Sequence, residues 1–363
     1  MKQQDISFAT KENVEFIKEL RQKVSEYFNT NNLSKQGNSK LLLKTIFMFT
    51  LYLAPYLLML TGVINSLGLV FVAWIVMGLG MAGIGMAVMH DANHFSYSKN
   101  KTINKIMSYS LFMVGGFPTN WQHQHNTLHH GYTNIDGMDE DISPPVSLLR
   151  FSPHKPLQKI HKFQFLYAWF FYGMMTLMWA TSKDFKQLNR YFKSDSSFGT
   201  NKSYTKLLVE IILSKAIYYI ILLALPMLML PFAWYWIVLF FLVMQFTAGF
   251  ILTIIFQTAH VVPTSEYPLP NKEGSMENNW AVHQLHTTSD FAPNNKILSW
   301  LIGGLNFQVV HHLFPNISHV HYPKISKLVQ SMTEKYNLPY HVQPGFFKAL
   351  WEHTKMLKRL GTA

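Results

Sequence analysis

Four long apolar runs constrain this chain more than any other feature of its sequence. They cover residues 45–65, 67–89, 207–231 and 233–256. Each is close to the roughly 20 apolar residues that a helix needs to cross the hydrocarbon core of a bilayer. A large soluble core would not gather its apolar residues into uninterrupted runs of this length. We therefore expect an all-α, polytopic membrane protein with four transmembrane helices.

Two charged residues and two shorter apolar runs must also be placed relative to the membrane. The third run holds Glu210 and Lys215 near its start, and we expect both at the membrane interface. Two shorter apolar runs, residues 106–118 and 165–180, do not reach the length of a crossing helix. A single crossing by either would also divide the histidine clusters described below between two sides of the membrane. We expect these two runs to form interfacial or re-entrant helices.

Lysine and arginine are distributed unevenly around the long runs. Residues 1–44 hold eight of them and segment 90–206 holds thirteen, whereas the short joints inside each pair of runs carry no charge. Because Lys and Arg accumulate on the cytoplasmic side of membranes, we expect both termini and segment 90–206 in the cytoplasm, at a bacterial inner membrane. No stretch fits a signal peptide. The net charge of +12 then reflects membrane orientation, and we expect no nucleic-acid partner.

This topology divides the chain into three parts. We expect a cytoplasmic N-terminal segment, residues 1–44, a membrane domain, residues 45–330, and a cytoplasmic C-terminal tail, residues 331–363. The glycines of the second run, at positions 78, 80, 83 and 85, indicate close helix packing, which small residues allow inside membranes.

Histidine is frequent and clustered, and cysteine is absent. The chain has 17 histidines and no cysteine, which excludes disulfides, iron–sulfur clusters and cysteine nucleophiles from these residues. The first cluster, HDANH, places His90 and His94 directly after the second run. Residues i and i+4 share one face of a helix, so the two imidazoles can share one metal or serve neighbouring metals. An HxxxH pattern is expected about once by chance in a chain with this many histidines, so it is weak evidence alone.

The second cluster is more specific. HNTLHH contains His125, His129 and His130, and its HxxxHH pattern is expected by chance in only about 0.04 of such chains. His123 is offset from these three, and we expect it outside the metal shell. His260 ends the fourth run and reaches the same side of the membrane as the clusters, which favours it as a further ligand.

The third cluster, QVVHH, contains Gln308, His311 and His312. Adjacent histidines on a helix point about 100° apart, so they suit two metals, or one metal and a hydrogen-bonding partner. His319 and His321 follow, and we expect both to face solvent.

An acidic run follows the second cluster. It holds Asn134, Asp136, Asp139, Glu140 and Asp141. The simpler interpretation is a solvated acidic loop. The alternative is a set of carboxylates that orient metal-bound histidines through N–H to carboxylate hydrogen bonds.

The number of histidines points to two metals, because more than six exceed one coordination sphere. Imidazole suits Zn, Cu, Fe and Ni, and the spacing does not choose among them. Zinc cannot change its redox state, whereas a redox metal would allow oxygen chemistry on an unreactive C–H bond. A metal transporter is the alternative from another class of protein. Transporters bind their cargo near the bilayer midplane, but these histidines lie at the ends of runs and in loops.

The three histidine motifs, in this order after paired apolar runs, resemble the integral-membrane fatty-acid desaturase family over residues 45–330. The glutamine that opens the third motif is similar to the acyl-lipid and front-end branch, which desaturates between an existing double bond and the carboxyl end. The resemblance implies a cytoplasmic helical cap with a di-iron site and no catalytic residue beyond the metal shell. That shell would be His90, His94, His125, His129, His130, His260, Gln308, His311 and His312. In NNWAVHQLHTTSDF, His283 is a candidate additional ligand and His286 a weaker one.

The resemblance also implies the reaction and its partners. Family members take two hydrogens from neighbouring methylenes of a fatty-acyl chain that is linked to a lipid, to CoA or to a carrier protein, in contact with membrane lipid. Oxygen is the co-substrate, and its reduction to water takes two electrons from the acyl chain and two from a donor. Hydroxylation, ketolation and acetylenic chemistry at the same ligands stay open as alternatives. The HPGG motif of the fused haem domain in many eukaryotic relatives is absent here, so we expect an external ferredoxin or small haem cytochrome with its reductase.

Overall fold

The computed structural model describes residues 6–10, 13–144, 147–193, 198 and 200–362. Within these residues the fold is helical, apart from one pair of short strands. Four helical segments are long and apolar enough to cross a membrane: Ser39–Leu60, Leu67–Asn93, Tyr204–Met229 and Trp234–His260. The prediction of an all-α protein with four transmembrane helices is confirmed at this level.

The chain divides into two compact units that interleave along the sequence. The span unit contains Ser39–His123 and Trp169–Thr253. The histidine unit contains the chain up to Asn38, Gln124–Ala168 and the chain from Ile254 onward. Helices α7 (Gln164–Gly173) and α12 (Trp234–His260) contribute residues to both units.

The span unit holds most of the membrane-length helices. Its helices are α2 (Ser39–Leu60), α3 (Leu67–Gly83), α4 (His90–Asn93), α5 (Lys101–Ser108), α6 (Pro118–Gln122), α8 (Met175–Met178), α9 (Asp184–Lys193), α10 (Tyr204–Tyr219) and α11 (Leu225–Met229). The π-helical segments Ile84–Met89, Trp179–Lys183 and Ile220–Ala224 continue helices without a break, and Tyr109–Val114 is a 3-10 helix.

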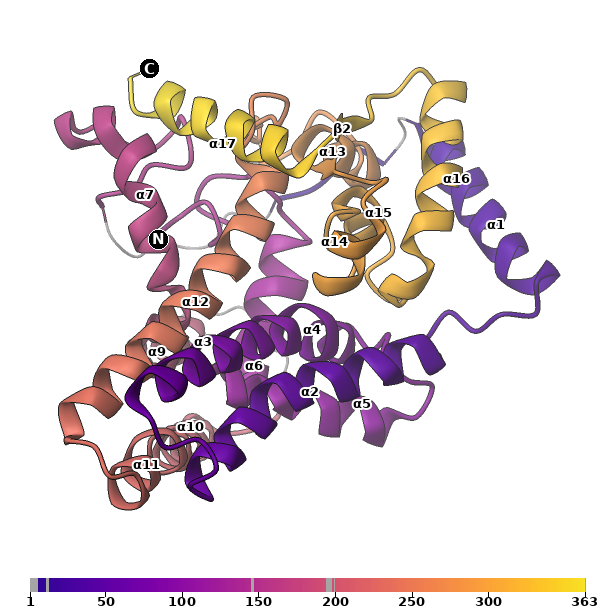
Figure 1. The fold of residues 1–363 in the computed structure, drawn as a ribbon. Coiled ribbons are helices and arrows are strands. Elements are labelled where there is room, and N and C mark those ends of the chain that lie inside the picture. The colour runs from indigo at the N-terminus through magenta and orange to yellow at the C-terminus, as the bar shows by residue number, and fades with distance from the viewer. Residues whose placement is uncertain (1–5, 11–12, 145–146, 194–197, 199, 363) are drawn as a thin grey trace. The chain divides into compact units, whose positions relative to one another are not determined.

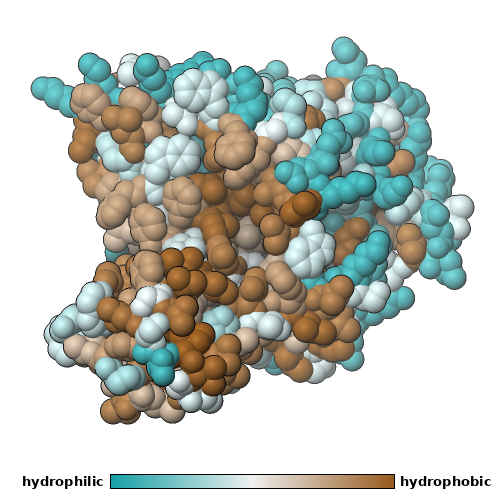
Figure 2. Space-filling view, viewed as in Figure 1, coloured by the Kyte–Doolittle hydropathy of each residue, from teal (hydrophilic) through white to brown (hydrophobic). Residues whose placement is uncertain are grey.

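Helices α2 and α3 pack against each other through a glycine (Figure 1). Helix α2 begins at Ser39, earlier than the apolar run that starts at residue 45. A Cβ on Gly80 would lie 2.6 Å from the backbone nitrogen of Tyr52, so only glycine permits this approach. Leucines at positions 42, 43 and 57 of α2 are more than half exposed, which suits contact with lipid tails. On the face drawn in Figure 2, apolar side chains cover much of the region that α2 and α12 occupy.

One charged residue near the start of the third run is buried inside the protein. Lys215, which we expect at the membrane interface, has its side chain enclosed by other groups of the chain. Its ammonium group pairs with the Asp184 carboxylate and donates to the carbonyl oxygens of Gly115 and Trp179. A buried ammonium requires such partners, because it would otherwise lose its hydration without compensation.

The two shorter apolar runs form broken helices. Residues 106–118 divide into the end of α5, a 3-10 helix and a turn at Gly115, whose φ is 87°. The other run contains α7 (Gln164–Gly173), α8 and a π-helical segment. Neither run is among the candidate spans found in the described residues, in line with the prediction that they do not cross.

The histidine unit combines shorter helices with a two-stranded parallel sheet. Besides the end of α12 and the first half of α7, its elements are α1 (Val14–Thr30), α13 (Trp280–Thr287), β1 (Ser289–Phe291), α14 (Lys296–Leu301), α15 (Gln308–Leu313), α16 (Tyr322–Lys335), β2 (His341–Gln343) and α17 (Phe346–Leu360). His123–His129 is π-helical, and Lys159–Phe163 and His319–His321 are 3-10 helices. In the sheet, Asp290 of β1 is opposite Val342 of β2.

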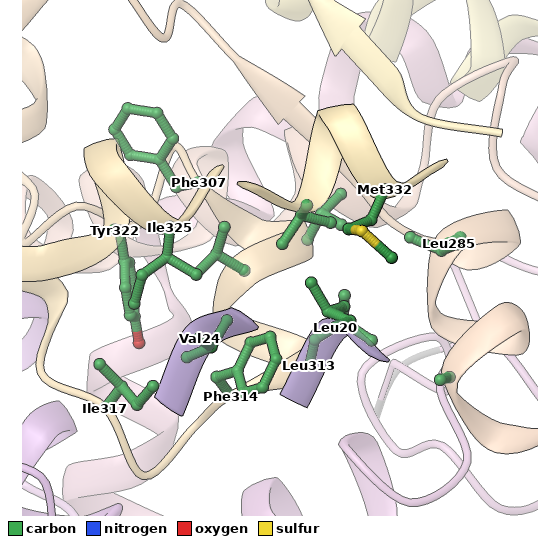
Figure 3. Close-up of a cluster of buried hydrophobic side chains, with 14 of the residues drawn as sticks. Leu20, Val24, Leu285, Phe307, Leu313, Phe314, Ile317, Tyr322, Ile325 and Met332 are labelled. Carbon is green, nitrogen blue, oxygen red and sulfur yellow. The ribbon is translucent and has the colours of Figure 1, made fainter. Parts of the chain in front are cut away.

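The core of this unit surrounds the third histidine motif. Helix α1 buries Phe16, Leu20, Val24 and Phe28, which recur every four residues and so share one face. That face packs against α16, beside which α1 lies in Figure 1. Figure 3 shows α1 side chains pointing toward Leu313 and Phe314 at the end of α15. This apolar packing fixes the position of α15, the helix that carries QVVHH.

Candidate metal centre

The first histidine pair lies in the span unit, at the end of a candidate membrane span. The π-helical segment Ile84–Met89 leads directly into α4, which begins at His90. The ring centroids of His90 and His94 are 4.8 Å apart, so the two imidazoles share one face as the HxxxH spacing predicts. Trp121 packs edge-on against both rings, at 5.7 Å. Both histidines are buried.

The second histidine motif forms a π-helical turn in the histidine unit. The amide of His130 donates to the carbonyl of His125, five residues earlier, at 3.0 Å. Such i to i+5 turns are rare and occur frequently at functional sites. The wider turn brings the Nε2 atoms of His125 and His130 to 3.3 Å from each other. The turn therefore adds the i, i+5 pair of His125 and His130 to the i, i+4 pair of His125 and His129 that a regular helix would provide.

A first set of three imidazoles converges in this unit: His125, His130 and His311. The Nε2 atom of His130 lies 3.0 Å from that of His311, in addition to its 3.3 Å contact with His125. Nitrogens this close need a proton or a metal cation between them. With metal–nitrogen bonds of about 2.1 Å, neighbouring ligands on one metal are about 3.0–3.4 Å apart. The Nε2 atoms of His130 and its two neighbours in this set therefore have the spacing of ligand nitrogens around one metal ion.

A second set contains His129, His260 and His312. One ring nitrogen of each lies within 4.8 Å of the others, and all three residues are buried. Their ring centroids are 4.7–4.9 Å apart. His311 and His312 thus face different sets, with their rings inclined by 83°. This divergence fits the first of the two arrangements considered for QVVHH, in which its adjacent histidines serve two metals rather than one metal and a hydrogen-bonding partner.

The Nδ1 atoms of four of these histidines face polar groups outside the two sets. The distance is 3.1 Å from His129 to Asp139, 3.3 Å from His260 to the Thr287 carbonyl, 3.1 Å from His311 to the Tyr322 hydroxyl and 2.7 Å from His312 to the Gln284 side chain. Metal-binding histidines characteristically hold one ring nitrogen on such a partner, which orients the other toward the metal. The arrangement therefore presents Nε2 to each set.

The acidic run contributes one of these partners. Asp139 is buried and accepts hydrogen bonds from the amides of Asn134 and Asp141, both at 2.9 Å. The prediction of a solvated loop is therefore wrong for Asp139, and its contact with His129 agrees with the alternative of an orienting carboxylate. Burial alone would lower the pKa of His129, but the carboxylates of Asp139 and Asp141 outweigh it and raise that pKa to about 9. A site that stabilises positive charge in this way also suits a cation in place of the proton.

Gln308, His283 and His286, the other residues that the sequence suggested for the site, each contact a polar group of the protein. Gln308 is buried at the first position of α15, where its amide donates to the Leu305 carbonyl at 2.8 Å. His283 has its Nε2 atom 2.8 Å from the Thr133 carbonyl, so this nitrogen is engaged by backbone rather than directed at either set. Burial lowers the pKa of His283 to about 4. His286 pairs with Glu266 at 2.8 Å and is partly exposed.

Three histidines outside the motifs are structural. His319 and His321 were expected to face solvent, but both are buried. The His321 ring packs edge-on against Phe28, at 5.0 Å, so the core formed by α1 covers it. His123 packs against Tyr191, with ring centroids 4.4 Å apart, in the span unit.

Sequence reasoning missed the partners that orient the histidines. Gln284, Thr133 and Tyr322 all contact motif histidines, yet none belongs to a histidine motif. Gln284 lies next to His283, in the stretch that the family resemblance singled out, and that proximity was the available signal. The buried histidines and their oriented nitrogens form a site that fits metal ions.

Comparisons with known proteins agree with this site. The family model described as fatty acid desaturase matches residues 66–344. The sn-1 linoleoyl-lipid 6-desaturase of Arthrospira platensis is 32% identical, over 95% of this chain and 92% of its own length. The acyl-lipid (8-3)-desaturase of Physcomitrium patens is 33% identical, over 99% of this chain and 74% of its own length. A similar 6-desaturase from Synechocystis is 32% identical, over 96% of both chains.

The relatives match the acyl-lipid and front-end branch that the glutamine of QVVHH indicated. With the four candidate spans and the buried histidine sets, the family match identifies an integral-membrane oxidoreductase of lipid metabolism. The chain belongs to the fatty acid desaturase family.

Proposed function

We propose that this protein desaturates the acyl chain of a membrane lipid at a centre of two iron ions. The observation that carries the proposal is the convergence of two separate sets of three imidazoles in the histidine unit. One set would hold each iron, with His125, His130 and His311 on one and His129, His260 and His312 on the other. Together with His90 and His94 the proposed shell contains eight imidazoles, which exceed the six ligands of one octahedral ion, and imidazole suits iron among the redox metals.

The remaining three members of the proposed shell are His90, His94 and Gln308. His90 and His94 end a candidate membrane span with their rings on one face, which is where ligands for a site at the membrane surface belong. Gln308 begins the helix that carries His311 and His312, and it also interacts with His260. Its amide oxygen can ligate weakly or hold a water molecule.

Iron bound at these residues would supply the activation of O2 that removal of hydrogen from an unreactive methylene requires. The protein's own contribution is to orient the imidazoles and to exclude bulk water. The buried Asp139, Gln284 and Tyr322 perform the orientation. Burial of the whole set provides the exclusion of water, which protects an oxidising centre from side reactions.

The substrate follows from the relatives, whose names specify acyl lipids. An acyl chain attached to a lipid can reach a membrane-embedded enzyme without leaving the bilayer. The uneven distribution of Lys and Arg supports an orientation with both termini and the metal centre in the cytoplasm. The two further electrons per turnover would come from a ferredoxin or small haem cytochrome.

The test is expression in a bacterial host with simple fatty acids, followed by lipid extraction and mass spectrometry with double-bond localisation. We expect new double bonds in lipid-linked acyl chains and about two irons per chain in carefully purified protein. Hydroxylated, keto or acetylenic products would assign the chain to another reaction of the same site. One metal or none, with activity intact, would contradict the two-iron centre.

A further inference from the structure

Gln284 lies at the contact between the second and third histidine motifs, and it belongs to neither. It is fully buried in α13. Its Oε1 atom is 2.7 Å from Nδ1 of His312 and 2.9 Å from the Thr133 hydroxyl. Its Nε2 atom is 3.3 Å from the carbonyl oxygen of His130. One side chain therefore contacts a ring of the third motif and the backbone of the second.

The His130 carbonyl decides which way the Gln284 amide faces. A carbonyl oxygen only accepts hydrogen bonds, so the group opposite it must be the amide NH2. The same carbonyl accepts from the indole Nε1 of Trp280 at 2.9 Å, which agrees with its role as an acceptor. The amide oxygen must then face His312. Because that oxygen only accepts, Nδ1 of His312 must carry the proton, which leaves the lone pair on Nε2.

We propose that Gln284 is a positioning residue that holds His312 in the tautomer whose Nε2 binds a metal. The inference rests on the proposed metal centre and adds a residue to it. Asp139 and Tyr322 act on neighbouring histidines, and Gln284 combines such a contact with one to the second motif's backbone. It therefore sets the tautomer of His312 and its distance from His130 together.

The experiment measures iron binding rather than turnover. Purified protein in detergent is loaded with Fe(II) without oxygen, and iron affinity is measured by competition with a chelator. Gln284→Met keeps the length and volume of the side chain but removes its hydrogen bonds. We expect one of the two irons to bind about 10–100-fold more weakly, the usual effect of losing such an orienting partner. Gln284→Glu keeps an oxygen for His312, and in its protonated form also a donor for His130, so it should restore most of the affinity.

Gln164→Met is the matched control. Gln164 is equally buried, and its amide hydrogen bonds go to the backbone of Arg150 and Leu357. It should lose as much thermal stability as Gln284→Met while both irons bind as in the parent. Equal loss of iron affinity in the two variants would overturn the proposal, because it would reflect general destabilisation.

Two outcomes separate this inference from the proposed centre. Parent-like binding of both irons by Gln284→Met would overturn the role of Gln284 and leave the centre intact. Absence of iron from the parent protein after the same loading would overturn both.

A second measurement is needed if Gln284→Met does not fold. Nitrogen-15 NMR of the zinc-loaded parent then reports the tautomer of His312, whose signals are assigned by their loss in His312→Gln. A protonated Nδ1 on His312 supports the inference, and a protonated Nε2 overturns it.

Discussion

At the scale of single residues, the orientation of each imidazole separates the candidate ligands from the structural histidines. His129, His260 and His312 present Nε2 to one another, with Nδ1 held by groups outside the set. His283 is just as buried, but its Nε2 atom faces the Thr133 carbonyl. Burial alone therefore does not identify a candidate ligand. The distinguishing feature is whether Nε2 faces other imidazoles or is held by a backbone carbonyl.

Loss of a single ligand should abolish product formation without preventing membrane insertion. His129→Ala and His311→Ala each remove one member of a different set, and we expect product to fall more than about 100-fold, beyond the effect typical of an orienting partner. Expression level and membrane fractionation should stay near normal, because neither residue lies in a candidate span. Mass spectrometry of the host's lipids measures the product.

The control for these variants must be an exposed histidine. His154 is exposed and its ring nitrogen lies 2.7 Å from the Tyr267 carbonyl, far along the chain from every histidine motif residue of the proposed shell, so His154→Ala should retain activity. His353 lies outside every motif and would be the natural choice from the sequence, but it is buried with Nδ1 2.8 Å from the Val261 carbonyl. His353→Ala should cost about 1–3 kcal/mol of stability by leaving that carbonyl unsatisfied. Equal loss of product in His154→Ala and His129→Ala would contradict the assignment of ligands.

At the scale of secondary-structure elements, α15 is held at its first turn by a buried carboxyl group. Asp290 of β1 accepts from the amide of Val309 at 2.9 Å and from the Tyr340 hydroxyl at 2.5 Å. The first amides of a helix lack partners within it, so a side-chain acceptor at this position stabilises the helix start. Asp290 thereby connects the chain after α16 to the helix that carries His311 and His312.

This carboxyl group should make stability depend on pH. Burial raises the pKa of Asp290 from its ordinary 3.8 to about 7. The folded state therefore prefers the protonated form, and this contribution is present below about pH 4 and is lost as the pH rises toward 7. We expect the melting temperature of the parent protein in detergent to fall between about pH 4 and 7.

Asp290→Asn is the variant that isolates this effect. Its amide oxygen can still accept from Val309, and it carries no charge at any of these pH values. The melting temperature of the variant should change less with pH than that of the parent. Identical pH profiles for the two proteins would show that Asp290 does not titrate in this range.

The contact between α2 and α3 depends on one glycine. In Gly80→Ala the new methyl group would meet the backbone of Tyr52, which cannot move without displacing α2. We expect a loss of about 1–3 kcal/mol, the usual cost of overpacking. Gly68→Ala lies at the start of the same helix, where a Cβ meets no atom within 4 Å, and should be neutral. Thermal melting in detergent compares the two, and equal melting temperatures would refute close packing at Gly80.

At the scale of the whole molecule, the proposed reaction would need electrons from a separate donor. The 363 residues contain no cysteine for an iron–sulfur centre and no HPGG motif of a haem domain. In the proposed reaction, each turnover would require two electrons beyond those taken from the acyl chain. Basic residues that could attract an acidic donor are Lys155, Lys159, Lys162, Lys183, Lys186, Arg190 and Lys193. Opposite charges speed the encounter of two proteins, and salt screens them over about 8–10 Å.

Reconstitution with a purified donor and its reductase tests this requirement. We expect no turnover with NADPH alone, and turnover with the donor that falls as ionic strength rises. Lys159→Gln combined with Lys162→Gln should reduce the salt dependence, since both side chains are exposed. Lys324→Gln with Lys327→Gln makes the same change in charge on α16 and serves as control. Full activity with NADPH and no added protein would rule out an external donor.

The sequence by itself determined the number of candidate spans, the class of fold and the family. These properties are local, because the length of an apolar run reports directly on bilayer thickness, and a histidine motif occupies a few consecutive residues. The amphipathic face of α1 was also present in the spacing of Phe16, Leu20 and Val24, although the polar composition of residues 1–44 concealed it.

Only the tertiary structure decided how the histidines group and what orients them. His130 meets His311, which lies 181 residues away, and His312 meets Gln284, so neither contact has a spacing that could be read along the chain. The π-helical turn at His123–His129 likewise adds a pair that regular helical spacing does not contain. The burial of Lys215 likewise depends on its partner Asp184, which lies in another helix and could not be paired with it from the sequence. Such contacts depend on the packing of distant segments, because burying a polar group is tolerated only where the fold brings it a partner.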